Sequence, residues 1–263
     1  MKILHNIALS VSEESQKKFK ELGIELELGF SSFKIEENSD AWSQVKELVN
    51  KYDAVDTAST KFTKQELDSS GLLALNSTWH CGYPEPSQDF GYLSETYDLS
   101  NYCQECGVGK LQMNSFRFRG EPKWGAKSFL QTNWVFDEYF VLPSVWEKVF
   151  KPLNIDCREV LHYKTGKPLS TVVQLAIASS DLSLSDQNLP HETCSSCTRK
   201  KYLPITRGFF PRIEGCLGNP LMRMKESFGS GSLSYNPVIV SNNLFETITH
   251  LRLKGIAFTP VQS

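Results

Sequence analysis

Two Cys-x-x-Cys pairs, separated by the 87 residues 107–193, constrain the fold of this chain more than any other feature of its sequence. The two residues inside each pair allow a tight turn that directs both sulfurs at one ion. Four thiolates fill the tetrahedral shell of a structural Zn²⁺ and leave no open position. The sequence therefore predicts one shared structural zinc site, whose ligands are Cys103, Cys106, Cys194 and Cys197.

The long separation departs from a compact zinc ribbon, in which about 15–20 residues lie between the pairs. Loop-closure entropy grows only logarithmically with length, so an inserted folded segment is compatible with a shared site. Two alternatives stay open: unrelated pairs that remain reduced and metal-free, or a redox-active pair, although neither has the strand–CxxC–helix context of a thioredoxin fold. His191, three residues before the second pair, and Cys81, beside His80, are candidate additional ligands.

Composition indicates the environment of these cysteines. The chain has 28 Lys and Arg against 30 Asp and Glu, a net charge of −2, so no general binding to nucleic acid or to a membrane surface is expected. The first ten residues do not resemble a secretory signal, and no stretch approaches the ~18 apolar residues of a membrane span. We therefore expect a cytoplasmic protein with reduced thiols, in which Cys81, Cys157 and Cys216 are ordinary structural cysteines.

Hydrophobic periodicity predicts an α+β fold in two parts. Residues 2–11 alternate as a strand, residues 24–30 alternate again, and residues 40–52 follow the 3–4 spacing of a helix. This order predicts a small α+β unit over residues 1–75. Residues 76–263 are expected to form a larger β-rich domain around a zinc-ribbon-like site, with residues 107–193 inserted between the two cysteine pairs.

Side-chain caps mark the expected helix starts. Ser12 precedes two glutamates in a first helical turn, Thr63 and Glu66 form a capping box, and Ser241 precedes a final apolar-striped helix. Gly255 is expected to follow that helix before a last strand.

Motifs of enzyme chemistry are absent from the sequence: it contains no GxGxxG after a strand, no P-loop, no GxSxG and no HExxH. Asp137 and Glu138 could supply an acid–base pair, but neighbours in a strand point to opposite faces, so structural or solvated roles are favoured. An enzyme would need a site assembled from dispersed residues such as His80, Asp137 and Arg117, and it would show a deep pocket with converging polar groups.

A basic run, Arg199-Lys200-Lys201-Tyr202, follows the second cysteine pair. Such a run could neutralise phosphates while the aromatic ring stacks on a base, so a nucleic-acid-binding zinc ribbon is an alternative function. In a chain with a slight acidic excess, a solvated surface run is the more common arrangement.

Residues 95–263 resemble the double-CxxCG family, first noticed as paralogues in myxobacteria and associated with immunity proteins of bacterial toxin systems. Tyr97-Asp98 leads into the first pair, and the tail of residues 251–261 reads Leu-x-Leu-Lys-Gly-Ile-x-Phe-x-Pro-Val. Thr198 stands where the motif has the second glycine. The resemblance implies that the four paired cysteines are the motif cysteines and that the chain is a non-enzymatic module binding a toxin protein. Such a module predicts a contiguous acidic or aromatic surface patch.

Overall fold

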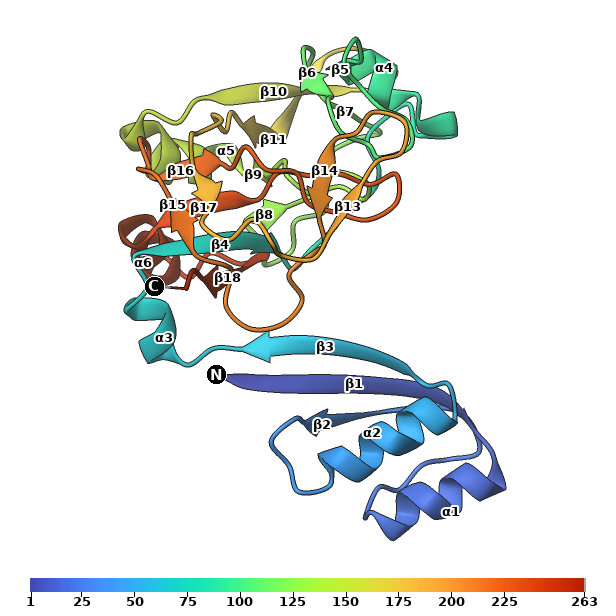
Figure 1. The fold of residues 1–263 in the computed structure, drawn as a ribbon. Coiled ribbons are helices and arrows are strands. Elements are labelled where there is room, and N and C mark those ends of the chain that lie inside the picture. The colour runs from blue at the N-terminus through green and yellow to red at the C-terminus, as the bar shows by residue number, and fades with distance from the viewer. Residues whose placement is uncertain (263) are drawn as a thin grey trace. The chain divides into compact units, whose positions relative to one another are not determined.

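The computed structural model describes residues 1–262 and divides them into two compact units, shown in Figure 1. The first unit comprises Met1–Glu66 with Ile205–Phe209, and the second comprises Leu67–Pro204 with the chain from Phe210 onward. Helices and strands are both present and strands predominate, which confirms the α+β class. Within residues 1–262 no helix has the length and apolar composition needed to span a bilayer.

The first unit is an antiparallel sheet with helices packed on one face. Within residues 1–66 the strand order is β2-β1-β3. The elements are β1 (Lys2–Val11), α1 (Glu13–Glu21), β2 (Gly29–Glu36), α2 (Trp42–Lys51) and β3 (Val55–Lys61). The short helix α3 (Lys64–Asp68) begins in this unit and ends in the second. Alternate side chains of β1, among them Ile7 and Leu9, pack against Phe19 of α1 and Val45 of α2. This alternation is the one that predicted the first strand.

Three predicted helix caps are confirmed. The Ser15 N–H donates to Ser12 Oγ (3.2 Å) at the start of α1, and the Leu244 N–H donates to Ser241 Oγ (3.3 Å) at the start of the last helix. At the start of α3 the Glu66 N–H donates to the Thr63 hydroxyl, and the Thr63 N–H donates to the Glu66 carboxylate.

The predicted strand over residues 24–30 is largely wrong. Residues 24–28 form a connection, and β2 begins at Gly29, which pairs with Val11. Because β1 ends at Val11, the residues before Gly29 have no strand beside them to complete a ladder. Leu26 nevertheless turns into the core of the unit, which explains part of the alternation.

The second unit contains two larger sheets and short two-stranded ribbons. Within residues 67–262 the five-stranded sheet has the order β7-β10-β11-β9-β8, and the four-stranded sheet has the order β16-β17-β4-β18. The strands are β4 (Leu72–Ser77), β7 (Arg117–Phe118), β8 (Phe129–Leu130), β9 (Phe140–Val141), β10 (Cys157–His162), β11 (Pro168–Leu175), β16 (Leu221–Arg223), β17 (Val238–Ser241) and β18 (Ile256–Pro260). The ribbons pair β5 (Tyr97–Asp98) with β6 (Leu111–Gln112), β12 (Ser183–Leu184) with β15 (Ile213–Glu214), and β13 (His191–Thr193) with β14 (Lys200–Tyr202).

Short helices complete the second unit: η1 (Gln88–Phe90), α4 (Tyr92–Thr96), α5 (Pro143–Val145), the π-turn Trp146–Phe150, the 3₁₀ turn Lys151–Leu153 and α6 (Asn242–His250). Residue 75, the predicted end of the N-terminal unit, lies within β4. This strand pairs with β17 and β18 near the C-terminus, so it is part of the second unit.

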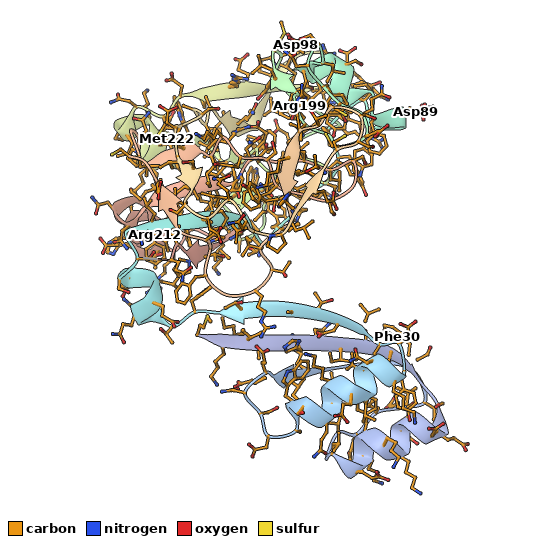
Figure 2. All side chains as sticks on the ribbon, viewed as in Figure 1. Phe30, Asp89, Asp98, Arg199, Arg212 and Met222 are labelled. Atoms are coloured by element: carbon orange, nitrogen blue, oxygen red, sulfur yellow. The ribbon has the colours of Figure 1, made fainter. Side chains whose placement is uncertain are left out.

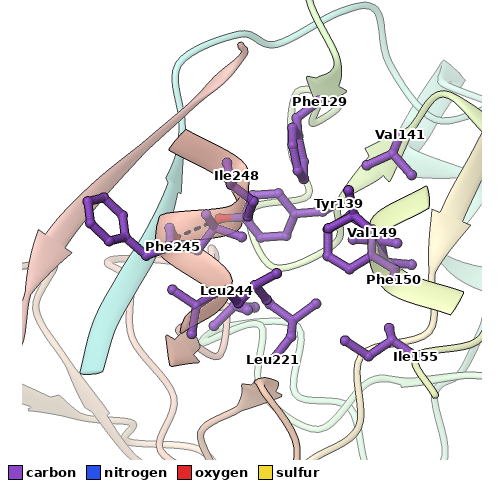
Figure 3. Packing of buried hydrophobic residues seen from close by; sticks show 14 of the residues in the cluster. Phe129, Tyr139, Val141, Val149, Phe150, Ile155, Leu221, Leu244, Phe245 and Ile248 are labelled. Atoms are coloured by element: carbon purple, nitrogen blue, oxygen red, sulfur yellow. Dashed lines mark hydrogen bonds between the residues drawn. The ribbon is translucent and has the colours of Figure 1, made fainter. Parts of the chain in front are cut away.

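The largest core lies between the four-stranded sheet, α6 and the α5 region (Figure 3). Tyr139 is fully surrounded there, and its hydroxyl donates to the carbonyl oxygen of Leu75 (2.7 Å). Phe129 and Phe150 meet edge to face at 5.9 Å between ring centroids. A second, aromatic-rich core beside the five-stranded sheet includes Phe116 and Phe140. Tyr97 of β5, in the hairpin that carries the first cysteine pair, belongs to this second core.

Candidate metal centre

The four paired cysteines come together in the second unit. Their Sγ atoms all lie within 4.8 Å of one another. Two of these contacts join the two pairs: Cys103 Sγ lies 3.7 Å from Cys194 Sγ, and Cys106 Sγ lies 3.6 Å from Cys197 Sγ. A disulfide would need about 2.05 Å, whereas four sulfurs at about 2.3 Å from a central zinc lie about 3.8 Å apart. The cluster therefore has the size of a tetrathiolate metal site.

The two cysteine turns repeat one backbone geometry, each at the tip of a hairpin, β5–β6 and β13–β14. In both turns the N–H of the first cysteine donates to the carbonyl five residues later, and the N–H four residues later donates back to the first cysteine's carbonyl. The donor and acceptor pairs are Cys103–Val108 (2.9 Å), Gly107–Cys103 (2.8 Å), Cys194–Arg199 (3.0 Å) and Thr198–Cys194 (2.9 Å). The turns are held by their own backbone, so a local sequence pattern was enough to predict them.

Gly107 and Thr198 occupy the same place in the two turns, and both have left-handed backbone angles. Their φ values are +76° and +61°. A Cβ atom on Gly107 would lie 2.2 Å from the carbonyl oxygen of Ser232, so this position requires glycine. Thr198 adopts the same conformation with a β-branched side chain, a strained arrangement, and its hydroxyl donates to the carbonyl oxygen of Cys197 (2.7 Å). The departure from the motif therefore preserves the shape of the turn.

The basic run beside the second pair is directed inward, and the expectation of a solvated run is wrong for Lys201. The Lys201 side chain is 1% exposed. Its Nζ donates to the carbonyl oxygens of Cys106 (3.0 Å), Gly231 (2.5 Å) and Leu233 (3.1 Å). An ammonium group has three N–H donors, and here each one has an acceptor. A positive charge is thus fixed next to the cysteine cluster.

Arg199 and Lys200 are also held by the second unit. Arg199, labelled in Figure 2, donates from Nη1 to the carbonyl oxygens of Asn101 (2.5 Å) and Val108 (3.0 Å), which ties the second turn to the first. Lys200 Nζ donates to the carbonyl oxygen of Gln187 and lies 4.5 Å above the Tyr202 ring. The three cations are bound to their own chain rather than displayed together for phosphates.

The thiols of the first turn have different acidities. The backbone N–H of Cys106 donates toward the Cys103 sulfur and lowers the pKa of Cys103 to about 7. Burial raises the pKa of Cys106 to about 12. A bound metal deprotonates its thiol ligands outright, so both cysteines can act as thiolate ligands.

The two additional candidate ligands lie outside this group, which among residues 1–262 contains only the four paired cysteines. The Nδ1 atom of His191 lies 2.8 Å from the carbonyl oxygen of Leu189. Cys81 packs beside the aromatic-rich core, and its N–H donates to the carbonyl oxygen of Gln131. Neither residue is needed to complete a shell of four ligands.

The dispersed enzyme candidates do not form one site. His80 is exposed, Arg117 Nη2 lies 3.8 Å from Glu95, and no interaction within residues 1–262 joins either of them to Asp137. The expectation that Asp137 and Glu138 point to opposite faces is wrong. They precede β9 in irregular backbone and both turn toward Arg223, whose Nη1 lies 3.6 Å and 2.9 Å from their carboxylates.

Comparison with known proteins adds no family to these observations. No protein-family model, curated protein or solved structure matches the chain. The four-cysteine cluster, which could hold a metal ion, is consequently the feature of the second unit most directly tied to a chemical role.

Proposed function

We propose that this chain is a non-enzymatic protein-binding module. In this proposal its second unit is stabilised by a structural Zn²⁺ in a zinc-ribbon-like site. Its partner is a bacterial toxin, which the chain neutralises as an immunity protein. The observation that carries the metal proposal is the spacing of the four sulfurs, which joins two hairpins far apart in sequence. The toxin partner follows from the resemblance of residues 95–263 to the double-CxxCG family.

A structural role for the metal is supported by the ligand set and by its surroundings. Four cysteines leave no coordination position for water or substrate. A zinc ion with four thiolates carries two negative charges, and the ammonium of Lys201 is fixed beside the cluster to offset part of that charge. The metal would contribute to the folding free energy because it fixes both hairpins at once.

A protein-binding role is supported by an aromatic ridge, which consists of the exposed Tyr83 and Phe90 and the partly buried Trp134 between them. The Trp134 ring centroid lies 4.3 Å from that of Tyr83 and 4.6 Å from that of Phe90. Tyr83 is 47% and Phe90 50% exposed, and a groove runs along each side of Trp134. Large aromatic side chains of this kind supply much of the binding energy in protein interfaces.

Backbone strain is concentrated at the same ridge. Asp89, Phe90 and Trp134 all have positive φ values, 48°, 54° and 70°. Asp89 projects at the outer edge of the second unit in Figure 2. Non-glycine residues in this region are disfavoured and cluster at functional sites, so the strain supports a binding role for the ridge, whose Trp134 also packs against the aromatic-rich core. The steric mechanism that we propose is that this ridge covers the active site of the toxin.

The metal proposal is tested by elemental analysis of the purified chain. We expect about one zinc ion per molecule. Cys103→Ser should lose the metal and lower the melting temperature, whereas Cys157→Ser, which changes a cysteine outside the cluster, should retain it. A metal-free, folded wild-type protein with an unchanged melting temperature after chelation would refute the proposal.

The partner proposal is tested with the protein encoded by the neighbouring gene. Co-expression of this chain should relieve the growth defect that the neighbouring protein causes, and the two purified proteins should bind. Phe90→Ala should weaken binding by about tenfold or more, while Phe30→Ala, an exposed phenylalanine of the first unit, should leave it unchanged. Equal effects of both substitutions, or no binding at all, would contradict the proposal.

A further inference from the structure

A second candidate site lies beside the first cysteine hairpin, in a pocket of about 380 Å³. Its walls come from the β5–β6 hairpin, from β11, from β16 and from the segment before β9. Cavities of about 300–1,000 Å³ are typical of small-molecule sites in proteins. The pocket lies within the second unit and makes no use of the aromatic ridge.

The floor of this pocket is an ionic network. Arg223 Nη1 donates to Glu138 Oε1 (2.9 Å), and Gln174 Nε2 donates to Glu138 Oε2 (2.8 Å). Gln174 and Gln112 also exchange two side-chain amide bonds, of 2.7 Å and 2.8 Å. Both oxygens of Glu138 are thus satisfied by side chains that hold each other in place, so the floor is preorganised.

Other polar atoms of the same floor have no hydrogen-bond partner among the described residues, although they are buried. They are Asp137 Oδ1, Tyr97 Oη and Arg223 Nε. Asp137 is only 3% exposed and Tyr97 only 7%. Burial raises the pKa of Tyr97, as do the carboxylates of Glu138 and Asp137, so its hydroxyl keeps its proton.

The charges of the floor do not balance. Two carboxylates, Asp137 and Glu138, face one guanidinium, that of Arg223, which leaves one excess negative charge in a buried place. Buried charges are stable when they are paired and hydrogen-bonded. A ligand that brings a cationic N–H group would supply the missing positive charge beside these two carboxylates, which both line the pocket.

The rim of the pocket has the opposite sign. Lys110, Arg158 and Lys225 line it. Arg158 and Lys225 are exposed and form no ion pair within residues 1–262, and Arg158 is held beside the floor because it pairs with Gln174 in the β10–β11 ladder. Lys110 Nζ lies 3.3 Å from the carbonyl oxygen of Ser234. Such a rim favours an anionic group at the mouth of the pocket.

We propose that this pocket binds a small zwitterion of the amino-acid type, with its cationic nitrogen at the acidic floor of Asp137 and Glu138 and its carboxylate at the basic rim. An acidic floor and a basic rim within one small cavity match a molecule that carries both charges a few bonds apart. The proposal stands independently of the metal and of the protein partner.

Calorimetric titration of the purified full-length chain with each of the twenty common L-amino acids tests this site. At least one should bind with a Kd below about 10 mM. Its N-acetyl derivative lacks the cation and its methyl ester lacks the carboxylate, so each should bind about tenfold more weakly or worse. No binding by any amino acid, or equal binding by either derivative, would overturn the proposal.

Two variants locate the binding site on the chain. Arg158→Ala changes an exposed rim residue, so the protein should remain folded. The variant should bind the free amino acid about tenfold more weakly than the wild type does, but it should bind the methyl ester equally well. Arg212→Ala is the matched control, because Arg212 is also exposed and does not line the pocket. Unchanged affinity in Arg158→Ala, or the same loss in both variants, would refute the assignment.

Discussion

Lys201→Met removes the positive charge beside the cysteine cluster while keeping a side chain of similar length. The substitution deprives the carbonyls of Cys106, Gly231 and Leu233 of their shared donor. A buried polar group without its partner costs about 1–3 kcal/mol, so three carbonyls at the low end of this range amount to about 3 kcal/mol. In a unit of about 150–250 residues, 1 kcal/mol corresponds to about 2–4 °C, so the melting temperature should fall by about 6–12 °C.

The metal affinity should fall as well. Groups that support metal ligands without binding the metal typically contribute about 10–100-fold to affinity. Lys201 is such a group if the cluster holds zinc, because its ammonium bonds the carbonyl of Cys106 and offsets the charge of the thiolates. Competition with a chromophoric zinc chelator measures this affinity, and a thermal melt by circular dichroism measures the stability.

Lys200→Met is the matched control, since it makes the same replacement at the next residue. Lys200 is partly exposed, and its Nζ donates to a single carbonyl, that of Gln187. Losing this exposed bond and the contact of Nζ with the Tyr202 ring should lower the melting temperature by less than about 4 °C and leave the zinc affinity unchanged. If Lys201→Met binds zinc as tightly as Lys200→Met and melts at the same temperature, the inferred role of Lys201 is wrong.

Further predictions concern the cysteine turns. Gly107→Ala should destabilise the second unit by about 3 kcal/mol or more in a denaturant titration, because the added Cβ would lie 2.2 Å from a carbonyl oxygen. Gly71→Ala is the control: a Cβ at position 71 would have no atom within 4 Å, so stability should change by less than about 1 kcal/mol. Thr198→Gly should relieve the strain at φ +61° and stabilise the chain by about 1 kcal/mol; a loss of stability would show that the threonine hydroxyl matters more. In chelator-treated protein, iodoacetamide should modify Cys103 before Cys106, with a rate midpoint for Cys103 near pH 7. Folding lowers the pKa of the Cys103 thiol from 9.0 to about 7. The thiolate therefore contributes stability that is complete above pH 9 and is lost as the pH falls through 7. An alkylation midpoint near pH 9 would contradict the lowered pKa.

Local patterns predicted local structure well. Ser12 and Ser241 cap helices because the cap bond closes within three residues, and each Cys-x-x-Cys turn closes within five. The meeting of the two cysteine pairs was also predicted, although residues 107–193 intervene, because four thiols that are to serve one ion must converge. In these cases the physical cause is contained in the motif itself.

The remaining features depend on partners that are distant in the sequence. Asp137 and Glu138 were expected on opposite faces of a strand, but strand formation there depends on pairing with β8 and β11, and that pairing reaches only Phe140 and Val141. Arg223, which draws both carboxylates inward, follows them by more than eighty residues. No periodicity in either segment carries that information.

Lys201 shows the same dependence in one hairpin. Neighbouring residues of a strand face opposite sides, so a basic run on β14 must direct some of its cations inward. An inward lysine is stable only where acceptors surround it, and here they come from the first cysteine turn and from residues 231–233. The same turn also contributes Gly107 to the wall of the polar pocket and to the groove beside the aromatic ridge. One tight turn thus links the cysteine cluster to both candidate binding surfaces. Glycine is required at position 107 because a Cβ there would lie 2.2 Å from the carbonyl oxygen of Ser232, whereas the second turn accommodates threonine.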